Sequence, residues 1–247
     1  MSEPATGREI RDNACEIKFL VSHDTADRLR ERARTLLAPD PWASGSHADQ
    51  YTTTTLYFDT DKYAVFNRQG SFRRAKYRIR RYGASDAVFL ERKLRTSELL
   101  SKRRTLVRLD ELAFLQTEVA DELWSGRWFH QRLLMRRLRA VTQVTYDRTA
   151  RVAMTDYGVI RLTIDEGLKA LPVESAAFVS DGPATPLPVE AIVEMKYRAE
   201  MPAVFKRLAE EFGLHAGRVS KYRLGVATAR PEVAQAASVI AADGDHA

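Results

Sequence analysis

Alternating hydrophobic and polar positions run through most of this chain and predict β-strands. Apolar and polar side chains exchange at every residue, which is the period of a strand with one buried face. The predicted strands are residues 15–22, 51–59, 76–82, 87–94, 102–109, 140–148, 150–155, 159–166 and 191–197. Turn signals at Gly83 and at Tyr157 and Gly158 separate neighbouring strands, which is typical of an antiparallel sheet.

Apolar residues at helical spacing predict three further segments. These are residues 23–37, 110–137 and 202–213. We expect Asp24 or Thr25 to cap the first helix, because short polar side chains accept hydrogen bonds from free backbone N–H groups. The third helix is expected to start at Pro202 and to end at Gly213. Strands therefore predominate, and the predicted fold class is α+β.

The chain is organised as a single domain according to its pattern. Its 247 residues allow one large domain or two small ones. The pattern shows neither an internal repeat nor an interdomain linker. We expect one domain over residues 13–228, with flexible tails at 1–12 and 229–247.

Charge narrows the choice of partner. The chain carries 39 Lys and Arg against 33 Asp and Glu, for a net charge of +6. This basic excess favours an anionic partner, which includes nucleic acid, acidic lipid and phosphate compounds. Cys15 is the only cysteine, so the chain forms no internal disulfide. With a polar N-terminus and no apolar run of membrane-span length, the chain is expected to be cytoplasmic.

The sequence pattern Glu-x-Lys occurs in three predicted strands. The pairs are Glu16 and Lys18, Glu91 and Lys93, and Glu194 and Lys196. Residues two apart share one face of a strand, so acid and base point to the same side each time. One interpretation is an ordinary sheet with its charged face in solvent. The alternative is a barrel of about eight strands whose charged faces point inward, around a polyanion and a metal ion.

An ordered series of segments decides in favour of the second interpretation. The segments are EIKF (16–19), LYFDT (56–60), KYRIRRYG (76–83), FLERK (89–93), SKRR (101–104), TYDRTA (145–150), RLTID (161–165), VEMKYR (193–198) and SKYRLG (220–225). Together they resemble the VTC domain, a polyphosphate polymerase family in the CYTH or triphosphate tunnel metalloenzyme superfamily. The resemblance runs from Glu16 to Gly225.

The resemblance implies the triphosphate tunnel fold, an antiparallel eight-stranded β-barrel tunnel with flanking helices. It implies a catalytic path that consists of Lys18, Arg78, Arg80, Lys93, Arg148, Arg161 and Lys221. It also implies phosphate-binding neighbours at Lys76, Lys102 and Lys196. Glu194 and Glu16 would hold Mn²⁺ or Mg²⁺, and Glu91 is a second choice for metal or for orienting lysines.

The first strand departs from the wider superfamily. In hydrolases and cyclases of that group, the first strand has the pattern Glu-x-Glu-x-Lys. This chain has Ala14, Glu16 and Lys18 at the corresponding positions. The missing carboxylate weakens a two-metal hydrolase interpretation and favours the polymerase branch. The expected reaction moves the γ-phosphate of ATP onto a polyphosphate chain with a divalent metal.

Two alternatives remain at this point. They are an inorganic triphosphatase or polyphosphatase, and a non-catalytic module that binds polyphosphate. The expected partners are ATP, triphosphate or polyphosphate. A nucleic-acid partner is not expected, because aromatic residues are not interleaved with the basic faces. Any coupling to a membrane would need a partner protein.

Overall fold

The sheet dominates the computed structural model, which describes residues 10–12, 14–43, 47–95 and 100–244. Eight long strands form one antiparallel sheet: β2 (Ala14–Val21), β4 (Gln50–Asp59), β5 (Ala75–Tyr82), β6 (Ala87–Arg95), β7 (Leu100–Arg108), β8 (Arg139–Thr155), β9 (Gly158–Pro172) and β11 (Ala191–Arg198). Three short strands extend it: β1 (Ile10–Asp12), β3 (Ala38–Pro39) and β10 (Thr185–Pro186). The predicted α+β class is confirmed.

The two edges of the sheet are consecutive in the chain. Its hydrogen-bonded order is β1-β7-β6-β5-β4-β8-β9-β11-β2, with β10 on β9 and β3 on β8. Only residue 13 separates β1 from β2, so the chain itself joins one edge to the other. Among the described strands β2 pairs only with β11, and hydrogen bonds do not close the sheet into a true barrel. The eight-stranded tunnel fold is confirmed, without the complete ladder that a closed barrel would have.

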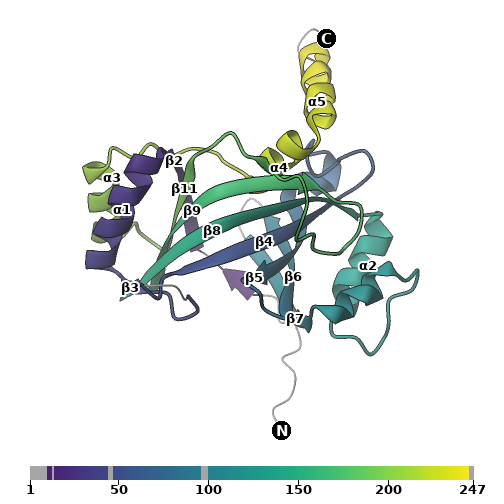
Figure 1. Cartoon of the computed structure of the whole chain (residues 1–247), viewed down its shortest axis with the longest axis horizontal. Coiled ribbons are helices and arrows are strands. Elements are labelled where there is room, and N and C mark those ends of the chain that lie inside the picture. Colours follow the sequence, from purple (N-terminus) through teal and green to yellow (C-terminus); the bar gives the residue numbers. More distant parts are fainter. Residues whose placement is uncertain (1–9, 13, 44–46, 96–99, 245–247) are drawn as a thin grey trace.

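Helices flank the sheet at both ends of the molecule. They are α1 (His23–Leu36), α2 (Arg127–Arg136), α3 (Ala203–Glu211), α4 (Lys221–Ala229) and α5 (Pro231–Gly244), with 3₁₀ turns η1 (Gly70–Arg74) and η2 (Asp110–Gln116). Helices α1 and α3 lie together at one end and α2 at the other, while α5 projects away from the sheet (Figure 1). None of the helices in the described ranges is long and apolar enough to cross a membrane.

Two apolar cores lie between the helices and the outer faces of the strands. Leu29 of α1 and Phe205 of α3 pack with Val193 and Met195 of β11, all fully buried. At the other end, Phe129 of α2 belongs to the core that covers β4 to β7. The helices therefore cover one face of each strand, and the opposite face points into the curve of the sheet.

The structure corrects three expectations about local elements. Ser22 caps α1, because its Oγ accepts a hydrogen bond from the Thr25 N–H at 3.2 Å. The helix expected over 110–137 is interrupted between η2 and α2. A side chain at Gly126, which precedes α2, would lie 2.4 Å from the Trp124 ring, so a close approach replaces a helical turn there. The strands predicted over 140–148 and 150–155 form one continuous strand, β8.

The flexible tails predicted at 1–12 and 229–247 stay a prediction. Residues 1–9 and 245–247 lie outside the described residues. Residues 231–244 form α5.

Candidate functional site

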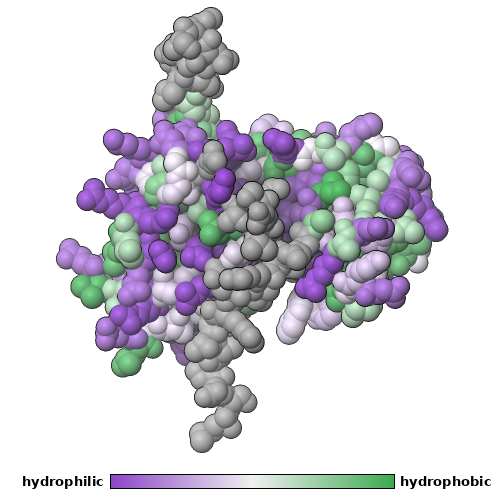
Figure 2. Space-filling view, turned by 180° about the vertical axis from the view of Figure 1, so that it is seen from behind, coloured by the Kyte–Doolittle hydropathy of each residue, from purple (hydrophilic) through white to green (hydrophobic). Residues whose placement is uncertain are grey.

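The charged faces of the strands point into the sheet and away from its helices. On β11, Val193 and Met195 pack beneath α1 and α3, so Glu194 and Lys196 point to the interior. On β5, Tyr77 and Ile79 belong to the core with α2, so Lys76, Arg78 and Arg80 also face inward. In the space-filling view, hydrophilic side chains cover much of the surface on both sides of the molecule (Figure 2). The interpretation as an ordinary solvent-facing sheet is therefore wrong for these strands.

Side chains from distant strands meet across this interior. Lys93 on β6 donates a hydrogen bond to Glu16 on β2 at 3.2 Å. Lys76 on β5 donates to the Ser220 Oγ, just before α4, at 2.9 Å. Five strands lie between β6 and β2 in the sheet order. The Lys93–Glu16 contact therefore requires the sheet to curve around a common interior.

Glu16 and Glu194 hold the first group of interior charges. Lys18 Nζ lies 2.9 Å from Glu16 Oε1 and 3.2 Å from Glu194 Oε1. Lys93 contacts Glu16, and Lys196 Nζ lies 3.8 Å from a carboxylate oxygen of each glutamate. The two glutamates therefore share the lysines of β2 and β11, and Glu16 also holds the lysine of β6.

Lys221 brings a cation into the same interior from a helix. It is the first residue of α4, whose N-cap is Ser220. Its Nζ lies 2.5 Å from Asp165 Oδ2 and 2.7 Å from Glu194 Oε1. Arg148 on β8 donates two hydrogen bonds to the same carboxylate, at 2.6 Å to Asp165 Oδ1 and at 2.7 Å to Asp165 Oδ2. Such a planar fork fixes the direction of the guanidinium as well as its charge.

Glu91 on β6 organises a second group. Its carboxylate is 1% exposed and lies within 3.0 Å of Arg78, Lys102 and Arg104. Arg80 donates to the Thr55 Oγ1 at 3.2 Å instead. These contacts agree with the expected role of Glu91 in orienting cations.

Arg161 lies apart from both groups. Its guanidinium donates to the Tyr51 hydroxyl at 2.7 Å and lies 2.8 Å from Asp40 Oδ2. The side chain is about one-third exposed, so part of it is accessible to a ligand while its guanidinium holds the buried Asp40 carboxylate.

Burial and mutual charge shift the pKa values of the group. Burial alone would raise the pKa of the Glu16, Glu91 and Glu194 carboxyls, but the surrounding cations outweigh it and lower each one. Burial together with the charges of Lys18 and Lys93 lowers the pKa of Lys76 to about 7. Burial also lowers the pKa of Lys196 to about 8, although Glu194 and Glu16 oppose that shift.

The interior collects all the residues expected from sequence, and three that were missed. The missed residues are Arg104, two positions after Lys102 on β7, Asp165, four positions after Arg161 on β9, and Asp40, which pairs with Arg161. Arg104 and Asp165 follow the same-face spacing, so strand periodicity was the available signal for these two, whereas Asp40 lies just after the short strand β3 and has no such signal. Among the residues that the structure describes, the interior defined by these contacts includes eleven cations (Lys18, Lys76, Arg78, Arg80, Lys93, Lys102, Arg104, Arg148, Arg161, Lys196 and Lys221) and five carboxylates (Glu16, Asp40, Glu91, Asp165 and Glu194).

This excess of positive charge is suited to a polyanion. Like charges held together inside a protein raise its free energy unless an anion offsets them. Glu16 and Glu194 supply hard oxygen donors, and Mg²⁺ or Mn²⁺ needs only one or two carboxylates when phosphate oxygens complete its shell. The donor chemistry therefore fits a metal held jointly with phosphate. Within the described ranges, no group of three or more His, Cys, Asp or Glu residues has the arrangement of a metal site made by protein alone.

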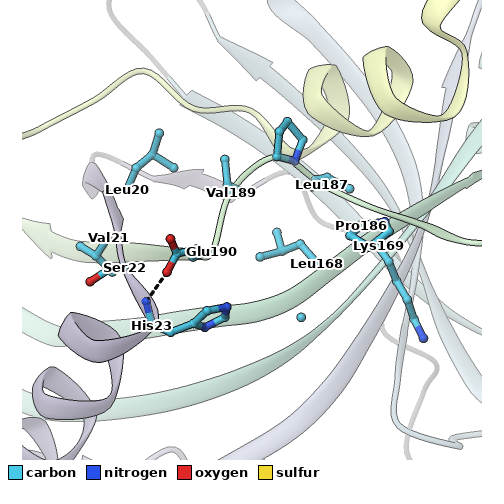
Figure 3. A pocket seen from close by; sticks show the side chains of 12 residues that line it. Leu20, Val21, Ser22, His23, Leu168, Lys169, Pro186, Leu187, Val189 and Glu190 are labelled. Atoms are coloured by element: carbon cyan, nitrogen blue, oxygen red, sulfur yellow. Dashed lines mark hydrogen bonds between the residues drawn. The ribbon is translucent and has the colours of Figure 1, made fainter.

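A separate cavity lies at the C-terminal end of β2. It has a volume of ≈ 710 Å³ and is lined mainly by apolar side chains of β2, β9 and the β10–β11 connection (Figure 3). At its wall, the His23 backbone N–H donates to Glu190 Oε2 at 2.7 Å. The eleven interior cations do not line this cavity, so it is distinct from the candidate phosphate site.

Solved structures share this fold at low sequence identity. A protein from Bacillus halodurans named a "putative adenylate cyclase" superposes with a TM-score of 0.52 at 15% identity, over 85% of this chain and 95% of that one. A "putative adenylyl cyclase" from Hippeastrum, described as having a dominant triphosphatase activity, gives 0.46 at 13% identity over 86% and 93%. The first of these superpositions shows a shared fold and nothing further.

The family model is the more specific comparison. No significant match to a curated protein is found. The model of the VTC domain matches residues 13–230, which include every strand from β2 to β11 and the interior charges that they carry. The chain belongs to the VTC domain family.

Proposed function

We propose that this domain is a metal-dependent phosphotransferase that lengthens polyphosphate with the γ-phosphate of ATP. The observation that carries the proposal is the interior set of eleven cations, drawn from seven strands and one helix. A chain of phosphates is a ligand that can contact so many cations along one path. Membership of the VTC domain family supports the same substrate class.

The chain's own residues position the γ-phosphate of ATP and the terminal phosphate of the polyphosphate, and they stabilise the negative charge of both. A terminal oxygen of the polyphosphate attacks the γ-phosphorus, and the bond to the β–γ bridging oxygen breaks, so that ADP leaves. Phosphoryl transfer depends mainly on alignment and charge stabilisation. Arg78, Lys93 and Lys102 are placed to neutralise phosphate oxygens, and Arg148 adds a fixed guanidinium.

Lys221 is placed to contact the reacting phosphate from α4. Its position between Asp165 and Glu194 holds the ammonium in a single place before substrate arrives. Glu194 and Glu16 would hold the divalent metal. When bound, Mg²⁺ or Mn²⁺ supplies positive charge to the oxygens of the β- and γ-phosphates.

The test is an incubation of the protein with ATP and either Mn²⁺ or Mg²⁺, with products resolved by gel and by ³¹P NMR. Long phosphate chains and an equal amount of ADP are expected. Orthophosphate without chains would replace the proposal with a triphosphatase. Absence of turnover with both metals, together with a higher melting temperature in polyphosphate, would leave a binding module.

Variants of interior residues, compared with a variant of an exposed arginine, distinguish a role of the interior site from a general effect of losing a charge. Arg78→Ala and Glu194→Ala are expected to abolish chain formation. Arg108→Ala is the matched control, because Arg108 lies on β7 with a 75% exposed side chain. Wild-type levels of chain formation in both Arg78→Ala and Glu194→Ala would contradict the assignment of the site.

A further inference from the structure

The interior face changes its chemistry at one end of four neighbouring strands. Cations predominate along most of this face, as with Arg78 and Arg80 on β5. Where β4 and β6 begin and β5 and β7 end, the same face carries apolar and aromatic residues: Tyr51, Tyr82, Phe89 and Leu106. Tyr82, Phe89 and Leu106 each lie two residues from an interior position on the same strand, and Tyr51 pairs across the sheet with Arg148.

The three rings form one connected cluster. The centroids of Tyr51 and Tyr82 are 5.4 Å apart, at an interplanar angle of 85°. Those of Tyr82 and Phe89 are 5.7 Å apart, at 66°. These separations are typical of edge-to-face aromatic pairs. The cluster, defined as Tyr51, Tyr82 and Phe89, is named the aromatic end of the interior.

Arginine joins the aromatic end to the phosphate path. The Arg104 guanidinium carbon lies 3.3 Å from the centroid of Phe89 and 5.8 Å from that of Tyr82. Arg104 also contacts Glu91, and Arg161 donates to the Tyr51 hydroxyl. Two arginines that can reach phosphate therefore border a set of ring faces and edges.

The aromatic end is partly exposed to solvent. Its three rings are only partly buried, unlike the fully buried Phe129 beneath α2. Leu106, on the same face, is 55% exposed. Inorganic polyphosphate has no apolar or planar part that would use these groups, whereas a nucleotide has a flat base attached to its phosphates.

We propose that the aromatic end binds the base of a nucleoside triphosphate, whose phosphates then extend from Arg104 and Arg161 into the cationic interior. Base stacking on aromatic rings and on guanidinium planes tolerates any base. The inference rests on the proposed function, because it assigns a place to the donor's base within the same site. It predicts that the domain distinguishes a nucleotide from a triphosphate of equal charge that has no base.

The test compares the binding of ATP and of methyl triphosphate by calorimetry in buffer with EDTA, where turnover cannot interfere. Methyl triphosphate has the same charge as ATP but lacks a base. We expect wild-type protein to bind ATP about tenfold more tightly, which is within the range for stacking one base. Phe89→Leu keeps an apolar side chain without the ring and is expected to remove most of that difference while methyl triphosphate affinity stays within twofold.

Two results would overturn the inference. One is equal affinity of the wild-type protein for the two ligands. The other is an equal loss of both affinities in Phe89→Leu, which would mean that the ring only holds Arg104. Tyr51→Leu provides a second variant on another strand, should Phe89→Leu fail to fold. Leu123→Ala, at a side chain 97% exposed, is the control.

Failure of the proposed function gives a different result. If wild-type protein binds neither methyl triphosphate nor inorganic tripolyphosphate, the cationic interior is not a phosphate site, and both proposals fall. If both ligands bind but ATP has no advantage, only the assignment of the base is wrong.

Discussion

Lys93 on β6 donates a hydrogen bond to Glu16 on β2 across the interior, at 3.2 Å. The two strands are separated by five others in the sheet. This side-chain contact therefore joins two strands that have no direct backbone hydrogen bonds to each other. Lys18 and Lys196 contact the same carboxylate. Glu16 thus contacts three lysines, and we propose that a bound phosphate competes with its carboxylate for them.

Replacing Glu16 by Gln tests this competition directly. Without the carboxylate charge, Lys18, Lys93 and Lys196 repel one another, so the ligand-free protein should melt at a lower temperature. Inorganic tripolyphosphate in metal-free buffer should bind more tightly, by roughly threefold or more, because an internal anion no longer competes with it. Calorimetry and thermal melts with and without tripolyphosphate measure both effects.

Glu200→Gln is the matched control, since Glu200 is exposed just beyond β11. Weaker tripolyphosphate binding by Glu16→Gln in EDTA would contradict the competition. Loss of metal-dependent turnover together with tighter metal-free binding would support Glu16 as a metal ligand.

Glu194→Gln should be more damaging to stability. Glu194 is 6% exposed and accepts hydrogen bonds from both Lys18 and Lys221. An uncompensated buried charge costs about 3–5 kcal/mol, but Lys18 keeps Glu16 and Lys221 keeps Asp165 as partners, so we expect a smaller loss of about 1–3 kcal/mol. Urea unfolding of the variant and of Glu200→Gln gives the difference. A change below about 1 kcal/mol would mean that water reaches these lysines.

Binding of polyphosphate is expected to take up protons near neutral pH. Burial and neighbouring cations lower the pKa of Lys76 to about 7, and burial lowers that of Lys196 to about 8. A bound phosphate favours the charged ammonium and raises both values. The added affinity is therefore complete below about pH 7 and is lost as pH rises through the higher pKa values of the complex.

Calorimetry at pH 7.5 in two buffers of different ionisation enthalpy measures this uptake. Lys76→Met should take up fewer protons than the wild-type protein, and the comparison cancels the ionisation of the phosphates themselves. An unchanged uptake in Lys76→Met would show that Lys76 is already charged in the free protein.

The local pattern was sufficient for the strands and for the residues that share a face. Lys76, Arg78 and Arg80 alternate with Tyr77 and Ile79, and β5 forms with these two faces as predicted. Which face points inward depends on where the helices pack, and that is a property of the whole chain. The resemblance to a family, rather than the alternation, supplied that choice.

Contacts between distant strands could not be predicted from the alternation of polar and apolar residues. The Lys93–Glu16 contact depends on the curvature of the sheet, and Lys221 enters the interior from α4, for which the strand period carries no information. The interruption between η2 and α2 was missed because apolar residues on both sides of Gly126 continue the helical spacing. A tight approach of backbone to the Trp124 ring has no signature in that spacing.

The hydrogen bond between Tyr222 and Asp59 should hold Lys221 in place. Asp59, at the end of β4, accepts hydrogen bonds from the Thr60, Val65 and Phe66 N–H groups and from the Tyr222 hydroxyl of α4. Tyr222→Phe removes one buried hydrogen bond to a carboxylate that keeps only its backbone partners, so we expect a loss of about 1–3 kcal/mol in the free energy of unfolding. Because α4 also carries Lys221, tripolyphosphate affinity should fall as well.

Asp59→Asn should be worse than Tyr222→Phe. An amide group in place of Oδ2 faces the Phe66 N–H, so one donor meets another in a buried site. Tyr157→Phe is the control, because Tyr157 is 59% exposed at the β8–β9 turn. Urea unfolding and calorimetry on the three variants check the order. If Tyr222→Phe loses stability but keeps full tripolyphosphate affinity, the hydrogen bond stabilises the fold without positioning Lys221.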